Sequence, residues 1–162
     1  MRIKLNAVNA VLAVLVIVAY VWFFVISPTF VFKPAGEKPP LFGVPVADNV
    51  NWMVTELGAY KLHPNLIGGE PALIEVYVTD VKKSFTTVIA YSGPKTGAGP
   101  AINPDLRISL STDDFTRLYK SGDVMAEMVA LSKEGKAKIE FLKDTATLTA
   151  KGYKAIYDAI KI

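Results

Sequence analysis

The spacing of apolar and polar residues changes period along the chain, and each period predicts an element of secondary structure. Apolar and polar residues alternate, with many β-branched and aromatic side chains, over residues 72–80 (ALIEVYVTD) and 84–92 (SFTTVIAYS). Such alternation predicts two strands, and the short join between them predicts a hairpin. The same period recurs over 105–111 (DLRISLS) and 137–142 (AKIEFL), which predicts two further strands.

Helical spacing of apolar residues predicts the other elements. It occurs over residues 48–60, 112–121 and 123–134, and again along the C-terminal segment from 144 to 162. Ser111 stands three residues before Asp114, as in a capping box, and Asp123 is an expected N-cap for the next helix. The stretch TATLT near the C-terminus would also fit a strand. This order predicts an α+β domain with a mainly antiparallel sheet and helices packed on one face.

A long apolar run lies near the N-terminus. Residues 7–26 (AVNAVLAVLVIVAYVWFFVI) contain no charge, and twenty helical residues at about 1.5 Å each span the roughly 30 Å core of a bilayer. The run is longer than the apolar part of a cleaved signal peptide, and no small-residue cleavage site follows it. A buried core helix is the alternative. We predict a retained transmembrane helix.

Four segments follow from these patterns: a tail (1–6), the transmembrane helix (7–26), a proline-rich tether (27–47) and an α+β domain (48–162). The tether holds five of the ten prolines, a composition that favours an extended, semi-rigid spacer. Its apolar side chains would dock either on the bilayer or on the domain; they are Phe30, Phe32, Leu41 and Phe42.

Charge separates the domain from its anchor. Residues 43–162 carry fourteen basic and fourteen acidic side chains, so the positive net charge belongs to the N-terminal part. A domain with balanced, interspersed charges has no electrostatic footprint for nucleic acid. Arg2 and Lys4 precede the apolar run, which favours a cytoplasmic N-terminus and an extracytoplasmic domain. The chain has no cysteine, so it forms no disulfide.

The C-terminal part of the chain resembles the sterol carrier protein type-2 domain. The resemblance rests on PDLRISLSTDDFTRLYKSG (104–122), the apolar helix after it, and EGKAKIEFLKD (134–144) with a final helix. It extends over residues 72–161, agrees only in strand order for 72–92, and is absent from 1–47. It implies an apolar cavity between sheet and helices that accepts lipids or other hydrophobic molecules.

Ten apolar residues are the candidate lining of such a cavity. They lie on the predicted helices and the last strand: Phe115, Leu118, Met125, Met128, Val129, Ile139, Phe141, Tyr153, Ile156 and Tyr157. Ordinary core packing predicts the same pattern, although the flexible thioether of methionine suits a deformable pocket wall. The expected function is therefore a membrane-anchored domain that binds a lipid or other apolar ligand. The alternative is a tethered interaction or structural domain with a filled core, whose protein partner the sequence does not identify.

No pattern in the chain predicts catalysis. GPKTGAGP lacks the order of a phosphate-binding loop and is expected to be a long loop over 93–104. His63 has no clustered ligands and is expected at the surface, and Ser92 lacks the context of a hydrolase nucleophile. Asp113 and Asp114 fit a helix N-terminus, and Lys82 and Lys83 fit a charged hairpin tip that could also touch anionic headgroups. We expect no enzyme activity, no cofactor and no metal site.

Overall fold

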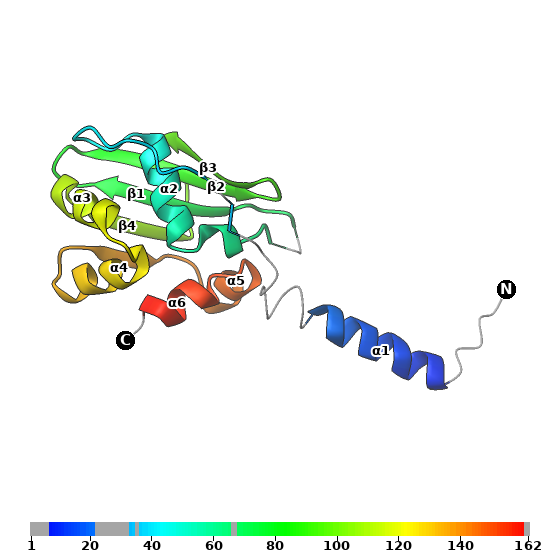
Figure 1. Ribbon diagram of the computed structural model, residues 1–162. Helices are drawn as coiled ribbons and strands as arrows, with labels where there is room; N and C mark the ends of the chain where they lie inside the picture. Colours follow the sequence, from blue (N-terminus) through cyan, green and yellow to red (C-terminus); the bar gives the residue numbers. More distant parts are fainter. Residues whose placement is uncertain (1–6, 22–32, 35, 66–67, 161–162) are drawn as a thin grey trace. The chain divides into compact units, whose positions relative to one another are not determined.

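The computed structural model describes residues 7–21, 33–34, 36–65 and 68–160 (Figure 1). The chain divides into two compact units, Met1–Val31 and Phe32–Ile162, which are described separately. The second unit therefore includes much of the segment predicted as a tether.

The described part of the first unit, residues 7–21, forms the helix α1 (Ala7–Val21). Its apolar side chains from Val11 to Val18 are each more than half exposed. The predicted transmembrane span continues to residue 26, but residues 22–26 lie outside the described part of the chain. Among the residues that are described, none of the helices has the length and apolar character needed to cross a membrane.

The second unit is an α+β fold built on a five-stranded mixed sheet in the order β3-β2-β1-β4-β5. The strands are β1 (Ala72–Val78), β2 (Lys83–Ala90), β3 (Gly93–Ala98), β4 (Leu106–Leu110) and β5 (Lys138–Phe141). The hairpin β1–β2 and the strands β4 and β5 agree with the sequence patterns. Antiparallel pairing joins β1 to β2, β2 to β3 and β4 to β5, but the central pair β1–β4 is parallel.

The parallel pair follows from β3, which the sequence pattern placed in a loop. That prediction was wrong, because residues 93–98 (GPKTGA) form an edge strand after a tight turn at Tyr91 and Ser92. Gly93 enters the strand with φ +94°, a conformation that a residue with a Cβ rarely adopts. β3 is rich in glycine and has few side chains to pack. Its backbone hydrogen bonds to β2 form without them, so the strand gives no alternating pattern in the sequence.

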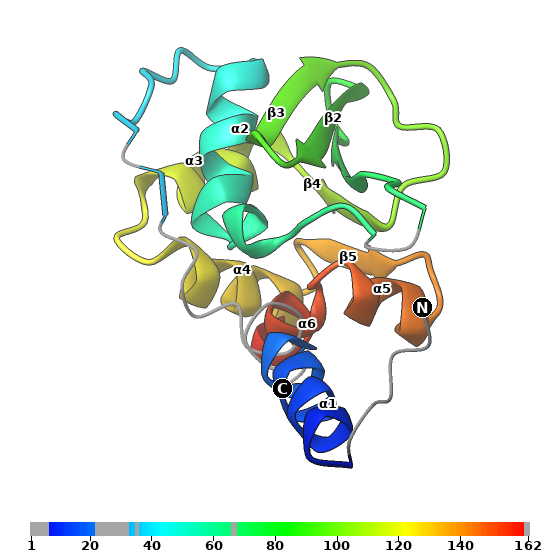
Figure 2. The ribbon, with the colours of Figure 1, turned by 90° about the vertical axis from the view of Figure 1, so that its right-hand side faces the viewer.

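The connection from β3 to β4 crosses the back of the sheet. The hydroxyl of Thr86 donates to the carbonyl oxygen of Gly99 at 2.9 Å, and the amide of Asp105 donates to Leu73 O at 2.9 Å. Thr86 points away from the core, since its neighbours Phe85 and Thr87 are the buried ones. Figure 2 shows the connection on the side of the sheet opposite α2 (Ala47–Glu56).

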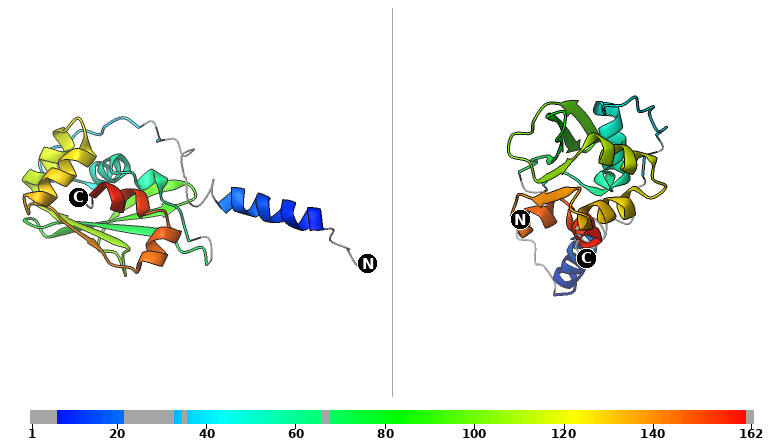
Figure 3. Two further views of the ribbon diagram at one scale, coloured as in Figure 1. Left: turned by 90° about the horizontal axis from the view of Figure 1, so that it is seen from below. Right: turned by 90° about the vertical axis from the view of Figure 1, so that its left-hand side faces the viewer.

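Alternate residues of the strands form the core face of the sheet. These residues are buried and include Ile74, Val76, Val78, Phe85, Ile89, Leu106, Ile108 and Leu110. The helices gather on that face, as Figures 2 and 3 show, which agrees with the predicted arrangement. The opposite face carries polar residues such as Thr86, and Arg107 Nε there donates to Glu75 Oε2 at 3.0 Å.

The middle helices begin where the capping residues predicted. After α2 and the short 3-10 helix η2 (Ala59–Lys61), the helices α3 (Thr112–Lys120) and α4 (Val124–Lys133) follow β4. Ser111 Oγ accepts from the amide of Asp114 at 3.1 Å, and Asp123 Oδ1 accepts from the amide of Ala126 at 3.0 Å. These contacts satisfy amide groups that an N-terminal turn leaves without an intrahelical partner.

The C-terminal segment forms two short helices instead of one continuous stripe. They are α5 (Thr145–Ala150) and α6 (Lys154–Ile160), and Gly152 between them has φ +85°. A Cβ at Gly152 would stand 3.1 Å from the carbonyl oxygen of Lys61, so the chain turns there in close contact with η2. TATLT is helical and not a strand.

A proline-rich strap, residues 36–42, runs along α2 and fixes the N-terminal end of the second unit. Lys38 Nζ lies 4.4 Å from the ring centre of Trp52 and 4.5 Å from that of Tyr119, and it donates to Tyr119 O near the end of α3. Asn49, which is 1% exposed, donates to Pro40 O at 3.0 Å. An ammonium group beside the C-terminal carbonyl groups of a helix is favourable.

Of the four apolar tether residues, the structure describes two. Leu41 packs against the core, whereas Phe42 is 86% exposed. Phe30 and Phe32 lie outside the described residues.

We predict that Lys38→Met lowers the free energy of unfolding of the second unit by about 1–2 kcal/mol, because a partly desolvated ammonium over two rings is lost. Chemical denaturation measures the change. Lys95→Met, at an exposed lysine of β3, is the matched control and should have no measurable effect. Equal stabilities for the two variants would show that Lys38 does not hold the strap.

Candidate functional site

The ten candidate lining residues divide into two groups. Five lie in the closed core: Phe115, Leu118, Met128 and Tyr153 are fully buried, and Ile156 is 3% exposed. These side chains are surrounded by other core residues, so packing accounts for them.

The other five are only partly buried, and with Ile160 we call them the apolar rim; Met125, Ile139, Phe141 and Ile160 pack against the core. Ile139 and Phe141 lie on β5, Met125 and Val129 on α4, and Tyr157 on α6. The first four are half-buried, and Tyr157 is 37% exposed. The rings of Phe141 and Tyr157 meet edge to face, with 5.1 Å between their centres.

The orientation of α4 is set by ion pairs with α3. Arg117 contacts Glu127 at 2.5 Å and Glu134 at 2.8 Å, so these acids lie on the flank of α4 that faces α3. By helical geometry, Met125 and Val129 lie on the opposite flank. Figure 1 shows α6 beside α4, on the side away from α3. The hydrogen bonds from Arg117 and Lys136 lower the pKa of Glu134 to about 2.

None of the ten candidates lies in the walls of three surface pockets that described residues form. The pocket of about 470 Å³ lies between the strap, α2 and the β2–β3 turn. A second, of about 430 Å³, lies between the strap and α3. The third, of about 360 Å³, lies between residues 45–47 and the start of β2.

A buried polar cluster ties the C-terminal segment to the sheet, and no sequence pattern indicated it. Lys151 Nζ lies 2.9 Å from Asp105 Oδ1 and also donates to Pro71 O at 3.0 Å. Lys151 is 3% exposed and Asp105 1%. The amide of Leu73 donates to Asp105 Oδ2 at 2.8 Å. Asp105 directly precedes β4, so the cluster joins the starts of β1 and β4 to the residue after α5.

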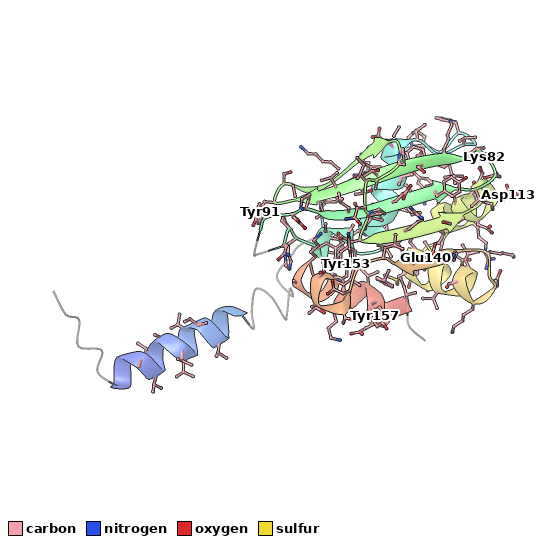
Figure 4. All side chains as sticks on the ribbon, turned by 180° about the vertical axis from the view of Figure 1, so that it is seen from behind. Lys82, Tyr91, Asp113, Glu140, Tyr153 and Tyr157 are labelled. Carbon is pink, nitrogen blue, oxygen red and sulfur yellow. The ribbon has the colours of Figure 1, made fainter. Side chains whose placement is uncertain are left out.

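Tyr153 completes this cluster. Its hydroxyl lies 3.2 Å from Leu73 O and 3.3 Å from Asp105 Oδ2. Burial, followed by the negative charge of Asp105, raises the pKa of Tyr153 well above its usual value. The phenol therefore stays protonated and serves as a hydrogen-bond donor. Figure 4 shows Tyr153 directed into the body of the unit, unlike Tyr157. A closed, fully paired cluster of this kind stabilises the fold and offers no group to a substrate.

His63 is not the surface residue that the sequence predicted. Its side chain is half-buried, Nδ1–H donates to Pro64 O at 2.9 Å, and Nε2 is buried without a described partner. A Cβ on Gly152 would lie 3.5 Å from this Nε2. His63 is held there because the chain turns tightly at Gly152.

The remaining candidates have ordinary surroundings. Ser92 is exposed in the β2–β3 turn, and Asp114 accepts a hydrogen bond from Ser111 in the capping box of α3. Lys82 and Lys83 are exposed at the β1–β2 hairpin. Within the described ranges, no group of histidine, cysteine, aspartate and glutamate side chains could hold a metal ion.

Comparisons with known proteins assign no family. No protein-family model matches the chain, and no curated protein matches it. Among solved structures, a protein described as "UbiJ-SCP2 Ubiquinone synthesis protein" aligns over 91% of this chain and 99% of its own, with 11% identity and a TM-score of 0.39.

The stereoselective inverting sec-alkylsulfatase Pisa1 from Pseudomonas sp. aligns over 48% of this chain, with 13% identity and a TM-score of 0.36. Its S233Y F250G double mutant aligns over 62% with the same identity and TM-score. The matched regions span only 12% and 14% of the two sulfatase chains. These identities and TM-scores are too low to carry an assignment.

We predict that Asp105→Asn destabilises the second unit by about 3–5 kcal/mol, because the Lys151 ammonium is left buried without its counter-charge. The amide has one acceptor oxygen, so its NH₂ group must face either Lys151 or the Leu73 amide, both of which are donors. Urea denaturation measures the loss. Asp158→Asn is the matched control, because the ion pair of Asp158 with Lys154 is exposed and worth about 0–1 kcal/mol. A loss at Asp105 no larger than that at Asp158 would contradict the structural role of the cluster.

Proposed function

We propose that the second unit binds an apolar ligand, a long acyl or isoprenoid chain, which enters at the rim between α4, β5 and α6. The observation that carries this proposal is the rim itself. Four of its side chains, those of Met125, Ile139, Phe141 and Ile160, pack against the closed core but keep part of their surface exposed, and Tyr157 is 37% exposed. The neighbouring Leu142 is 42% exposed.

The closing element of the rim is suited to movement. The helix α6 has seven residues, a length at which an isolated helix is not stable, and it follows the turn at Gly152. Its ring contact with Phe141 and the buried side chain of Ile156 hold it on the core. Displacement of α6 by a ligand would exchange apolar contacts with the protein for apolar contacts with the ligand.

The energy of apolar burial is sufficient for such binding. Each buried methylene group contributes about 0.8 kcal/mol, so a chain of about sixteen carbons offers roughly 12 kcal/mol before costs. Ordering of the chain and loss of rigid-body freedom remove several kcal/mol, which leaves an affinity near the micromolar range. No specific polar contact is required, in keeping with the apolar character of the rim.

Two features of the sequence support the proposal. The strand–helix stretch at 104–122 and the strand at 137–142 resemble the sterol carrier protein type-2 domain, in which an apolar cavity is expected. Residues 7–26 carry no charge and would hold the unit at a membrane, with the N-terminus cytoplasmic. The exposed apolar side chains along α1 support a lipid environment for that helix.

A second candidate function is a tethered protein-interaction or structural domain that binds no small ligand. The observation that favours it is the packing of Phe115, Leu118 and Met128, each of which is fully buried. A core closed at these positions leaves ligand binding to the rim alone.

We predict that Val129→Trp weakens binding of a fluorescent fatty acid by about tenfold or more, because the indole fills space at the rim. Ala126→Trp, at an exposed position of the same helix, is the matched control and should bind like the wild type. Fluorescence titration measures both affinities, and thermal unfolding confirms that both variants are folded. Absence of saturable binding by the folded wild-type protein, with acyl and isoprenoid probes, would favour the interaction domain.

We use Met128→Trp to test whether Met128 belongs to the packed core or lines a cavity. Because Met128 has no exposed surface, we expect overpacking to cost about 1–3 kcal/mol of stability. A variant with unchanged stability and lost binding would instead place Met128 in a cavity wall.

We predict that the full-length chain remains in the membrane pellet after alkaline carbonate extraction and keeps its N-terminal peptide. The charge-free run at 7–26 is the reason. Protease added to intact cells should then remove the second unit. Release into the supernatant would refute the anchor, and protection until lysis would reverse the orientation.

A further inference from the structure

The free edge of β5 has unused hydrogen-bonding groups. The amide of Leu142 donates to Asp105 O on the β4 side at 2.8 Å. Because the groups of an antiparallel strand alternate in direction, Lys138 and Glu140 bond towards β4, and the N–H and C=O groups of Ile139 point outward. The groups of Phe141 also point outward. Within the described ranges, no residue accepts a hydrogen bond from either outward N–H group.

The other edge of the sheet is protected, whereas this one is not. On β3, Pro94 has no N–H group, and α2 packs alongside, with Thr96 Oγ1 donating to Asn51 Oδ1 at 3.0 Å. β5 contains no proline. Its one lysine, Lys138, is neutralised by Glu140 at 2.8 Å and so gives no net repulsion against another strand. The left panel of Figure 3 looks at the unit from this side.

We propose that the β5 edge is a homodimer interface, at which β5 of a second copy pairs antiparallel across a two-fold axis through Ile139. The outward groups of Ile139 and Phe141 allow an axis through either residue, and of these two only the axis through Ile139 places Lys138 opposite Glu140. With an axis through Glu140, the two copies of Glu140 would face each other, but their backbone N–H and C=O groups already bond to β4. With the axis at Ile139, the two copies of this residue exchange N–H···O bonds, and the two sheets become one continuous sheet.

The side chains are complementary in this register. Lys138 of one copy faces Glu140 of the other at a non-hydrogen-bonded position, where cross-strand side chains are closest. The Lys138–Glu140 ion pair therefore forms twice, once on each side of the axis. On the opposite face, the half-buried side chains of Ile139 and Phe141 extend the apolar surface across the junction.

Disulfide trapping in the full-length chain tests the register, since the protein has no cysteine of its own. Cα atoms at a non-hydrogen-bonded antiparallel position are about 4.5 Å apart, within disulfide range. A mixture of Lys138→Cys and Glu140→Cys chains, purified in mild detergent, should form a heterodimeric disulfide in far higher yield than either chain alone. Lys95→Cys, on the β3 edge, is the control for random collision.

Charge reversal provides a second measurement. Lys138→Glu and Glu140→Lys should each reduce the dimer fraction several-fold in sedimentation experiments, because like charges then face each other across the axis. The double variant Lys138→Glu/Glu140→Lys should restore the wild-type fraction. A wild-type chain that remains monomeric at high concentration, with disulfide yields equal to the Lys95→Cys control, would overturn the proposal. Neither experiment measures ligand binding, so failure of the interface proposal can be distinguished from failure of the proposed binding function.

Discussion

The ion pair between Asp105 and Lys151 is the constraint on which the closure of the second unit depends. A buried ammonium group that loses its counter-charge destabilises the fold strongly, so the residues that supply the charge and the acceptors are held close to Lys151. Lys151 reaches Asp105 and Pro71 O, and Asp105 in turn accepts from the Leu73 amide. The starts of two central strands and the turn into α6 are thereby fixed together. The rim of apolar side chains exists in its observed form because this turn positions α6 over β5.

Sequence patterns predicted the elements whose signals are local. Alternation located β1, β2, β4 and β5, since alternate residues of each strand face the core. The caps at Ser111 and Asp123 marked the starts of α3 and α4, because capping needs only residues within one turn. The candidate lining residues all proved to be core or rim residues. Apolar periodicity shows which residues face inward but does not distinguish a lined cavity from a packed one.

What the sequence did not predict depends on contacts between distant residues. In the sequence, Asp105 stands at a polar position of an alternating strand pattern, which predicts an exposed side chain. It is buried because Lys151, from the C-terminal segment, pairs with it. Composition predicted a semi-rigid spacer and left open whether its apolar residues dock on the bilayer or on the domain, whereas Asn49 and Tyr119 bind the carbonyl groups of the strap. The helical spacing of the C-terminal segment did not show that the helix is interrupted at Gly152. The left-handed turn there depends on the nearby backbone of Lys61, which is distant in sequence. β3 was missed because glycine weakens the alternation while leaving the backbone ladder intact.

The crossover from β3 to β4 has a consequence for the order of folding. The strands β1, β2 and β3 follow one another closely and can pair as local hairpins, whereas β4 must return across the sheet to pair with β1. Non-local pairing of this kind forms slowly, because loop closure costs entropy before any contact compensates it. Until β4 docks, β1 is a sheet edge whose core-facing side chains include Val76 and Val78. During that interval β1 is open to pairing with other chains, so the nascent protein is most prone to aggregation before its C-terminal half has been made.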